Sequence, residues 1–279
     1  MNALSPIVLP LADALHCIAA EDVVAEHPVP RFDTCTIDGF AVRSSDRGEL
    51  RIIDEVPAGF VTVDAVVEGT AMRVAAGTML PEGADAVVPW VPVTEAIDVP
   101  VSAPGSNVLR AGARYPAGAS VCAAGTLIDA QVISVLAATG HRTVLVHPRP
   151  RVVIVPIGAE LARGGEPLRP GLIEDVTGVT LLAEAKLNQA DAYLAEPVRD
   201  DPDSVAGALE EARVRADLIV TTGGLGVLEG GELARTLGTS GGRTELDGLL
   251  VIALPGEPQA SLDAFRAQVS PLIQRLRGI

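Results

Sequence analysis

The spacing of apolar residues in the second half of the chain alternates between two patterns. Short continuous apolar runs are typical of strands covered on both faces, and recurrence every three or four positions is typical of helices packed on them. The apolar runs are 152–157, 190–195, 218–222 and 249–254, and the helical stretches are 175–189, 202–215, 229–237 and 258–276. This alternation predicts an α/β fold with a doubly wound, mainly parallel sheet.

The first half carries short β-like segments interrupted by glycine and proline. Residues 50–56 and 84–93 are two of these segments, and together they predict a small β-rich domain. Before them, Leu11, Leu15 and Ile18 recur at helical spacing and predict a short helix over 8–18.

A linker separates the two halves. Asp129 can cap a helix that Gly140 ends, and a strand is expected over 143–147. Pro148-Arg149-Pro150 follows, and because neither proline extends a strand ladder or a helix, this segment reads as a connection between domains.

Composition excludes several classes of function. The net charge is −15, so the basic surface of a nucleic-acid or anionic-membrane binder is not expected. The chain has three cysteines with no zinc-like spacing, which favours free thiols. It shows no signal peptide and no apolar run near the roughly 20 residues of a membrane span. We therefore expect a cytoplasmic protein.

Three segments leave a strand and turn towards a helix, where open parallel sheets bind their ligands. The first carries Glu160, and the others are 221–226, with three glycines, and 254–258, with a glycine between prolines. Glycine turns let backbone N–H groups approach a phosphate. The alternatives are a solvated carboxylate, a flexible turn and a stiff connection.

Acidic residues offer further candidates. Glu229 follows the glycine turn and can hold a cation opposite an anion, although a solvated helix carboxylate is the alternative. Asp33 and Asp38 stand five residues apart in a loop, a spacing compatible with acid–base or metal chemistry but nonspecific by itself.

Taken in order, these segments resemble the molybdopterin molybdenumtransferase family, of the MoeA and gephyrin E-domain type. The similarity covers nearly the whole chain and rests on six motifs in the family's order. They are Pro30–Arg43, Ala76–Val88, Gly105–Gly112, Arg149–Leu161, Thr222-Gly223-Gly224 and Leu254-Pro255-Gly256-Glu257-Pro258.

The resemblance implies a domain organisation. The first domain is split between 1–28 and 101–147 and serves linkage and dimerisation. A small β-rich domain occupies 29–100, and a molybdopterin-binding α/β domain occupies 148–279. The resemblance also implies an elongated homodimer, with a molybdoenzyme or a cofactor-pathway protein as a possible partner.

The resemblance also implies a reaction and its residues. Family members take adenylylated molybdopterin, a pterin phosphate, together with molybdate, release AMP with Mg²⁺ and leave molybdenum on the dithiolene. Carried over by motif, the catalytic residues are Asp38, Glu160 and Glu229, and the metal ligands are Asp201 and Glu229. The cofactor-binding residues are Thr222, Gly223, Gly224, Pro255 and Gly256.

The sequence departs from the family pattern where the family has acids. Two carboxylates of the G-E-D motif are replaced by Ala113 and Arg114, and the aspartate of T-G-D-E-L is Ala159. The D-S-N motif reads Glu174-Asp175-Val176, and L-P-G-N-P gains Glu257. No counterpart is found for the lysine-rich segment before the last strand or for the fourth, C-terminal β domain. The alternative function is a catalytically lapsed paralogue that binds molybdopterin as a carrier, a sensor or a dimeric scaffold.

Overall fold

A computed structural model describes residues 2–162, 165, 167–224 and 242–279. The chain divides into two compact units, which we describe separately. One consists of 1–21, 124–129 and 144–279, and the other of 22–123 and 130–143. The predicted domain division at 28, 100 and 147 stays a prediction.

The first unit is built on a five-stranded sheet in the order β14-β13-β15-β17-β16. Three of the four strand pairings in this sheet are parallel, and the fourth is an antiparallel hairpin of β16 and β17. The sheet is therefore mixed and mainly parallel. The strands are β13 (Arg151–Ile157), β14 (Asp191–Leu194), β15 (Leu218–Gly223), β16 (Arg243–Leu246) and β17 (Leu249–Leu254).

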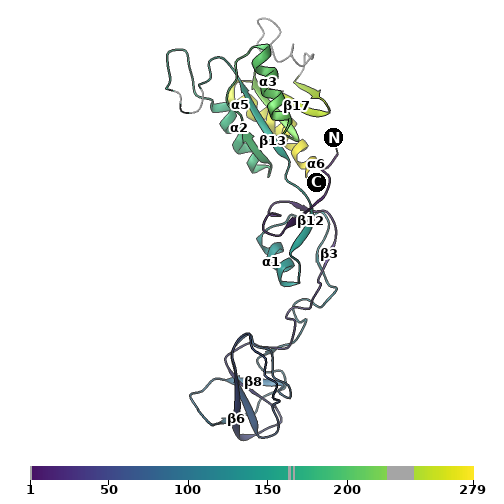
Figure 1. The fold of residues 1–279 in the computed structure, drawn as a ribbon, viewed down its shortest axis with the longest axis vertical. Coiled ribbons are helices and arrows are strands. Elements are labelled where there is room, and N and C mark those ends of the chain that lie inside the picture. The colour runs from purple at the N-terminus through teal and green to yellow at the C-terminus, as the bar shows by residue number, and fades with distance from the viewer. Residues whose placement is uncertain (1, 163–164, 166, 225–241) are drawn as a thin grey trace. The chain divides into compact units, whose positions relative to one another are not determined.

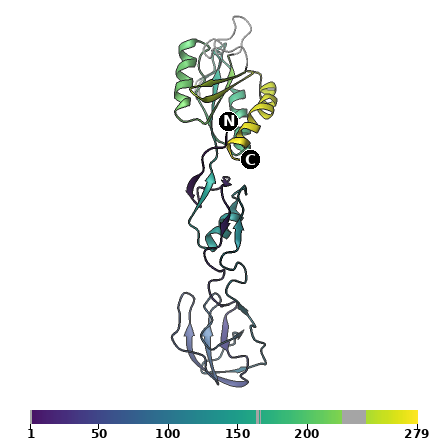
Figure 2. The same ribbon diagram turned by 90° about the vertical axis from the view of Figure 1, so that its right-hand side faces the viewer.

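Helices cover both faces of this sheet (Figures 1 and 2). Ile154 and Val220 pack on one face among residues of the helices on that side, including Leu181 and Phe265, whereas Val153 packs on the other face. The first set of helices is α2 (Val176–Leu187), α5 (Pro258–Ala264), the π-helical turn η1 (Phe265–Val269) and α6 (Ser270–Leu276), and the second face is covered by α3 (Pro202–Arg213). The alternation of side chains along each strand thus produces the doubly wound arrangement that the apolar runs predict.

The N-terminal segment forms strands instead of the predicted helix over 8–18, so that prediction was wrong. β1 (Ile7–Pro10) and β2 (Ile18–Ala19) lie on either side of β12 (Thr143–His147) in a three-stranded sheet. His16 has a φ of 66°, outside the right-handed helical region. Main-chain bonds with distant residues, including Ile128, replace helical ones.

The second unit contains a five-stranded sheet in the order β8-β5-β7-β6-β9. Apart from the parallel β6–β7 pair, its pairings are antiparallel. Phe40 and Leu50 are buried on one face and Ala41 and Met72 on the other. The strands are β5 (Gly39–Val42), β6 (Gly48–Val56), β7 (Thr70–Val74), β8 (Ala86–Pro89) and β9 (Ala96–Val99).

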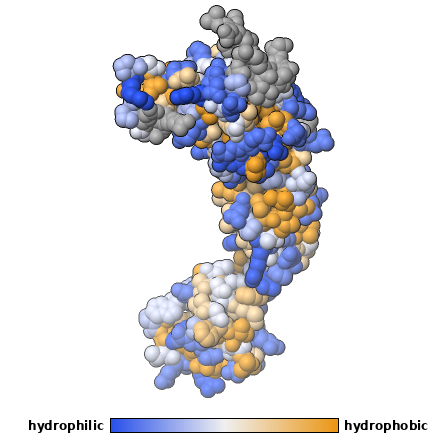
Figure 3. Space-filling view, turned by 45° about the horizontal axis from the view of Figure 1, so that its top comes forward, coloured by the Kyte–Doolittle hydropathy of each residue, from blue (hydrophilic) through white to orange (hydrophobic). Residues whose placement is uncertain are grey.

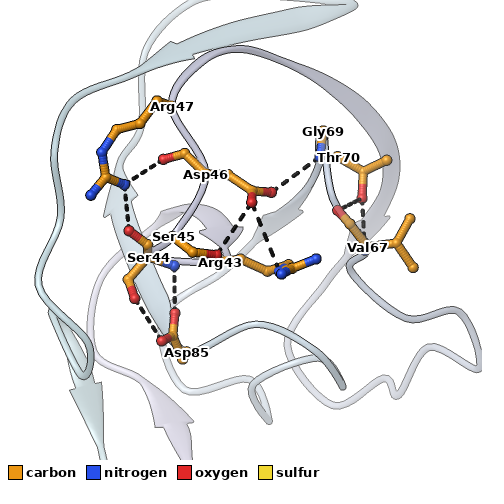
Figure 4. A network of polar contacts seen from close by, with 9 residues as sticks. All are labelled: Arg43, Ser44, Ser45, Asp46, Arg47, Val67, Gly69, Thr70 and Asp85. Carbon is orange, nitrogen blue, oxygen red and sulfur yellow. Dashed lines mark hydrogen bonds and ion pairs between the residues drawn. The ribbon is translucent and has the colours of Figure 1, made fainter.

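The turn between β5 and β6 is fixed by two carboxylates (Figure 4). Asp85 accepts from the main-chain N–H and the hydroxyl of Ser44, at 2.6 and 2.7 Å. Asp46, 9% exposed, accepts from the N–H of Gly69 at 3.1 Å. These acids hold the turn in place, so we assign them a structural role.

The rest of the second unit consists of short pairs and one helix. β3 (Val23–Val24) pairs with β11 (Ser120–Cys122), and β4 (Thr34–Cys35) pairs with β10 (Val108–Leu109). The expected helix after Asp129 is present as α1 (Ala130–Ala138). Among the described residues, no helix is long and apolar enough to cross a membrane.

Candidate functional site

Three loops of the α/β unit meet at one edge of its sheet. β13, β15 and β17 are parallel, so the segments that leave their carboxyl ends emerge side by side. A pocket of about 180 Å³ lies between these loops and the start of α2. It is lined by Ile157, Glu160, Leu161, Ile173, Glu174, Asp175, Val176, Thr177, Thr222, Gly223, Gly256 and Pro258. The pocket thus brings together Thr222, Gly223 and Gly256, three of the five residues predicted to bind cofactor, with the predicted acid Glu160.

Glycine is required where β15 ends. Gly223 and Gly224 have φ values of +79° and +66°, in the left-handed region that other residues rarely adopt. A Cβ on Gly223 would collide with the carbonyl oxygen of Ile157 on the neighbouring strand. A Cβ on Gly256 would lie 3.6 Å from the Cα of Gly223, so these two loops approach backbone to backbone.

Two threonine hydroxyls hold the loop that follows β17. Thr222 donates to the carbonyl oxygen of Pro255 at 3.0 Å, and Thr177 donates to that of Gly256 at 2.8 Å. Pro255 and Gly256 are therefore fixed from β15 and from α2 at the same time. Sequence reasoning selected Thr222 but missed Thr177, because the contact spans 79 positions and leaves no local signal.

Asp175 is the N-cap of α2 and lines the pocket. Its Oδ1 accepts from the N–H of Gly178 at 2.7 Å. Its Oδ2 is buried and has no hydrogen-bond partner within the part of the chain that the structure describes. Burial raises the pKa of this carboxyl, and the bond from Gly178 only partly opposes the shift.

Two further acids, Glu160 and Glu257, belong to the loops around the pocket, and their side chains lie in different surroundings. Glu160 is exposed and lines the pocket just beyond the end of β13, where the sequence predicted it. Glu257 caps α5 and accepts from the N–H groups of Gln259 and Ala260 at 3.1 and 2.6 Å. These bonds lower the pKa of the Glu257 carboxyl. Glu257 is thus a helix cap.

Two neighbouring aspartates lie before α3. Asp201 caps this helix: its two carboxylate oxygens accept from the N–H and the hydroxyl of Ser204, at 2.9 and 2.8 Å. These bonds lower its pKa. Asp200 lies beside the glycine turn, with Oδ1 3.4 Å from the place that a Cβ on Gly224 would take. Asp200 is therefore the acid that the structure sets against the predicted phosphate turn.

A second, larger pocket of about 660 Å³ lies on the α3 side of the same edge and shares Leu161 with the first. Arg169 and Arg199 belong to its wall, together with Gly158 and Ser204. The two pockets thus differ in charge: the smaller is lined by carboxylates and the larger by guanidinium groups.

The remaining predicted site residues lie elsewhere. Asp38, in the second unit, is exposed and accepts from the N–H of Ala76 at 2.8 Å. Nearby in sequence, Asp33 accepts from the N–H of Ala111 at 2.8 Å and from Arg110 at 2.5 Å. Glu229, predicted as a catalytic residue and a metal ligand, lies outside the described residues.

The described residues contain no group of three or more acidic, histidine or cysteine side chains placed to hold a metal ion. Mg²⁺ commonly binds through one or two carboxylates and completes its coordination with substrate phosphates and water. Asp200 beside Gly224 fits that mode, because the carboxylate and the predicted phosphate turn are adjacent.

Comparisons with known proteins identify the family of the chain. Residues 2–140 match the family described as MoeA N-terminal region (domain I and II), and residues 153–243 match the family described as probable molybdopterin binding domain. Molybdopterin molybdenumtransferase 2 of Mycobacterium tuberculosis is 30% identical over 312 residues, which cover 100% of this chain and 77% of the relative. The Bacillus subtilis molybdopterin molybdenumtransferase is 30% identical over 297 residues, 95% of this chain and 69% of its own.

A solved structure is also similar. The crystal structure of a molybdopterin biosynthesis MoeA protein from Pyrococcus horikoshii matches with a TM-score of 0.75 and 28% identity. The match covers 99% of this chain and 76% of that one.

Proposed function

The chain belongs to the molybdopterin molybdenumtransferase family and takes part in molybdenum cofactor biosynthesis, and from this premise we propose that the loop edge of its α/β unit is where the pterin substrate reacts. The substrates are adenylylated molybdopterin and molybdate. A water oxygen attacks the phosphoanhydride between AMP and the pterin phosphate, so that AMP leaves and the pterin keeps its phosphate. Molybdenum bonds to the two dithiolene sulfurs, and the molybdate oxygens that they displace leave with the thiol protons as water.

The observation that carries this proposal is the close approach of the loops after β15 and β17. Gly223 and Gly256 bring two stretches of backbone together without side chains between them. In this arrangement, N–H groups of the turn approach phosphate oxygens more closely than a substituted backbone allows. Thr177 and Thr222 hold the partner loop in place, so the edge is organised before the substrate arrives.

The acids around this edge take different roles in the proposal. Asp200, next to Gly224, would hold Mg²⁺ against the phosphates, and Asp201 and Glu229 remain the metal ligands that the family resemblance implies. When bound, Mg²⁺ would neutralise charge on the phosphates during AMP release. Glu160 is exposed and lines the pocket, which supports a role in proton exchange. Asp38 stays a catalytic residue on the family resemblance alone.

The full transferase and the lapsed carrier differ in one observable. A transferase releases AMP from adenylylated molybdopterin when Mg²⁺ and molybdate are present, and a carrier binds the pterin without this release. The curated relatives are named as transferases, so the carrier is not favoured. The test is AMP release measured with and without molybdate, with a longer family member as the positive control. Binding without release would overturn the proposed reaction.

We extend the proposal to the setting of the protein. A cytoplasmic homodimer that delivers its product to a molybdoenzyme or another cofactor-pathway protein is what the family resemblance implies. Light scattering of the purified protein measures the oligomeric state, and a monomer at micromolar concentration would contradict the dimer.

A further inference from the structure

Apolar side chains reach the surface of the protein at several places (Figure 3). One group of them follows a single line along α2. Val176, Val179 and Leu187 are exposed to 57, 57 and 73%, and Ala183, which completes the line, is also exposed. Because successive members are three or four residues apart, they lie on one side of the helix. We call these four residues the α2 stripe.

The opposite side of the same helix is already packed. Leu181 and Ala185 are fully buried in the core cluster beneath α2. A helix at the surface of a monomer normally has one apolar and one polar side, whereas α2 is apolar on both. Ile173, 55% exposed just before the helix, extends the apolar surface beyond the first turn. The pattern of α2 is therefore that of a helix covered on two sides.

Two charged side chains border the α2 stripe and make no ion pair within the described part of the chain. Lys186, the only lysine in the sequence, lies in the last turn of α2, and Glu174 directly precedes the N-cap residue. Glu184, in contrast, is already engaged, since its two carboxylate oxygens accept from Arg266 at 3.0 Å each. The stripe thus has an unpaired acid at one end and an unpaired ammonium group at the other.

This surface is complementary to itself when two copies of the helix lie antiparallel. A twofold axis through the middle of the stripe places Val176 opposite the partner's Leu187, and Val179 beside the partner's Ala183. The same axis brings Lys186 of each copy to the end where the other copy carries Glu174, so that two ion pairs form. A parallel pair would instead set lysine beside lysine. The charges therefore favour a second copy of this chain in the antiparallel orientation.

We propose that two copies of this chain dock through the α2 stripe about a twofold axis, with Lys186 of each copy paired with the partner's Glu174. This interface does not depend on the proposed reaction. It does change the site, because Glu174 and Val176 also line the small pocket. The partner's Lys186 adds a positive charge to a wall that Glu160 and Asp175 otherwise line with carboxylates.

A zero-length carbodiimide cross-link, which joins an amine to a carboxylate in contact with it, tests the ion pair directly. Within one chain, the length of α2 separates Lys186 from Glu174 by about 18 Å, more than their side chains can span. A peptide that joins Lys186 to Glu174 is therefore intermolecular. Mass spectrometry of the cross-linked wild type is expected to find this peptide, and its absence would overturn the pairing.

Sedimentation of the full chain measures the interface as a dimer dissociation constant. Leu187→Asp places a carboxylate from each copy in the apolar contact and should raise this constant at least about a hundredfold. Val214→Asp is the matched control: it alters a side chain of similar exposure, 79%, at the end of α3 and should leave the constant unchanged. Both positions are exposed, so both variants should remain folded. Equal constants for the two variants would overturn the interface.

A charge exchange tests the orientation of the two helices. Lys186→Glu and Glu174→Lys should each raise the dissociation constant about three- to thirtyfold, because each change replaces two ion pairs of the dimer with like charges. The double variant restores opposite charges and should recover most of the affinity. A double variant that dimerises no more tightly than either single one would overturn the antiparallel pairing.

The remaining outcomes separate this interface from the proposed function. A wild type that stays monomeric would overturn the interface and leave the α2 stripe to another protein, whereas its release of AMP would still support the proposed reaction. A dimer that forms the Lys186–Glu174 cross-link but releases no AMP would support the interface and contradict the reaction.

Discussion

The hydroxyl of Thr177 donates a hydrogen bond to the carbonyl oxygen of Gly256 at 2.8 Å, and this bond joins the first turn of α2 to the loop after β17. Both residues line the small pocket. Because Gly256 also lies against Gly223, the position of α2 is coupled to the glycine turn. The pocket therefore depends on a contact between a helix start and a distant loop.

Replacing Thr177 with valine tests this coupling. The change keeps the shape of the side chain but leaves the oxygen of Gly256 without its donor, which should lower the free energy of unfolding by about 1 kcal/mol. Pterin affinity should fall as well, because the loop is no longer fixed. The control is Thr180→Val, which removes a hydroxyl bonded within α2 to Val176 and should leave pterin affinity unchanged. Equal effects of both changes on calorimetric pterin binding would contradict the coupling.

The glycine turn after β15 permits a separate test. Gly223→Ala adds a Cβ both at positive φ and against the oxygen of Ile157. Gly248→Ala adds a Cβ at a φ of +84°, in a turn where no other group lies within 4 Å of that Cβ. The second variant should lose about 1–2 kcal/mol of stability from backbone strain alone, whereas the first should lose more and should also lose pterin binding. Denaturant unfolding and titration measure the two effects, and similar losses in both variants would show that the contact with Ile157 has no cost.

Asp200 and Asp201 provide the third prediction. Asp200 lies beside Gly224, whereas both oxygens of Asp201 are engaged by Ser204. Asp200→Asn should therefore raise the Mg²⁺ concentration needed for half-maximal AMP release more than Asp201→Asn does. Mg²⁺ titrations of the initial rate provide the comparison. A larger shift in the Asp201 variant would assign the cation to the residue chosen from the sequence motif.

The contrast between these aspartates shows where sequence reasoning ends. The apolar run 249–254 coincides with β17, because a strand buried on both faces has a continuous pattern. The helix predicted over 8–18 failed because Leu11 and Leu15 lie in the turns between β1 and β2, and Ile18 lies in β2, which pairs with β12. The edge strand β16 was not predicted, since its four residues are mostly polar.

The candidate site also contains features that the sequence reveals and features that it does not. Gly223 and Gly224 were selected from the sequence because a strand followed by glycines has a local signature. The partners of Thr177 and the free oxygen of Asp175 depend on long-range packing, which no spacing along the chain records. The choice between Asp200 and Asp201 likewise depends on the direction of each carboxylate.

The pH dependence of stability tests the burial of Asp175. Its carboxyl has a raised pKa in the folded protein, because burial disfavours the charged form. The folded state therefore holds this proton more firmly than the unfolded chain, and the wild type loses stability as pH rises from the ordinary value of about 4 through the folded pKa. Serine at this position caps the helix and does not titrate. The melting temperature of Asp175→Ser relative to the wild type should thus increase between about pH 3 and pH 7.

As a matched control, a variant at Asp201 is expected to change in relative stability with pH in the opposite direction. Asp201 also caps a helix, but hydrogen bonds from the N–H and the hydroxyl of Ser204 lower its pKa. The folded state then releases this proton more readily than the unfolded chain, so the contribution of Asp201 is present above its ordinary pKa and is lost as pH falls through the folded value. Asp201→Ser should become less stable relative to the wild type over the same rise in pH. Parallel curves for the two variants would mean that the second oxygen of Asp175 is solvated in the folded protein.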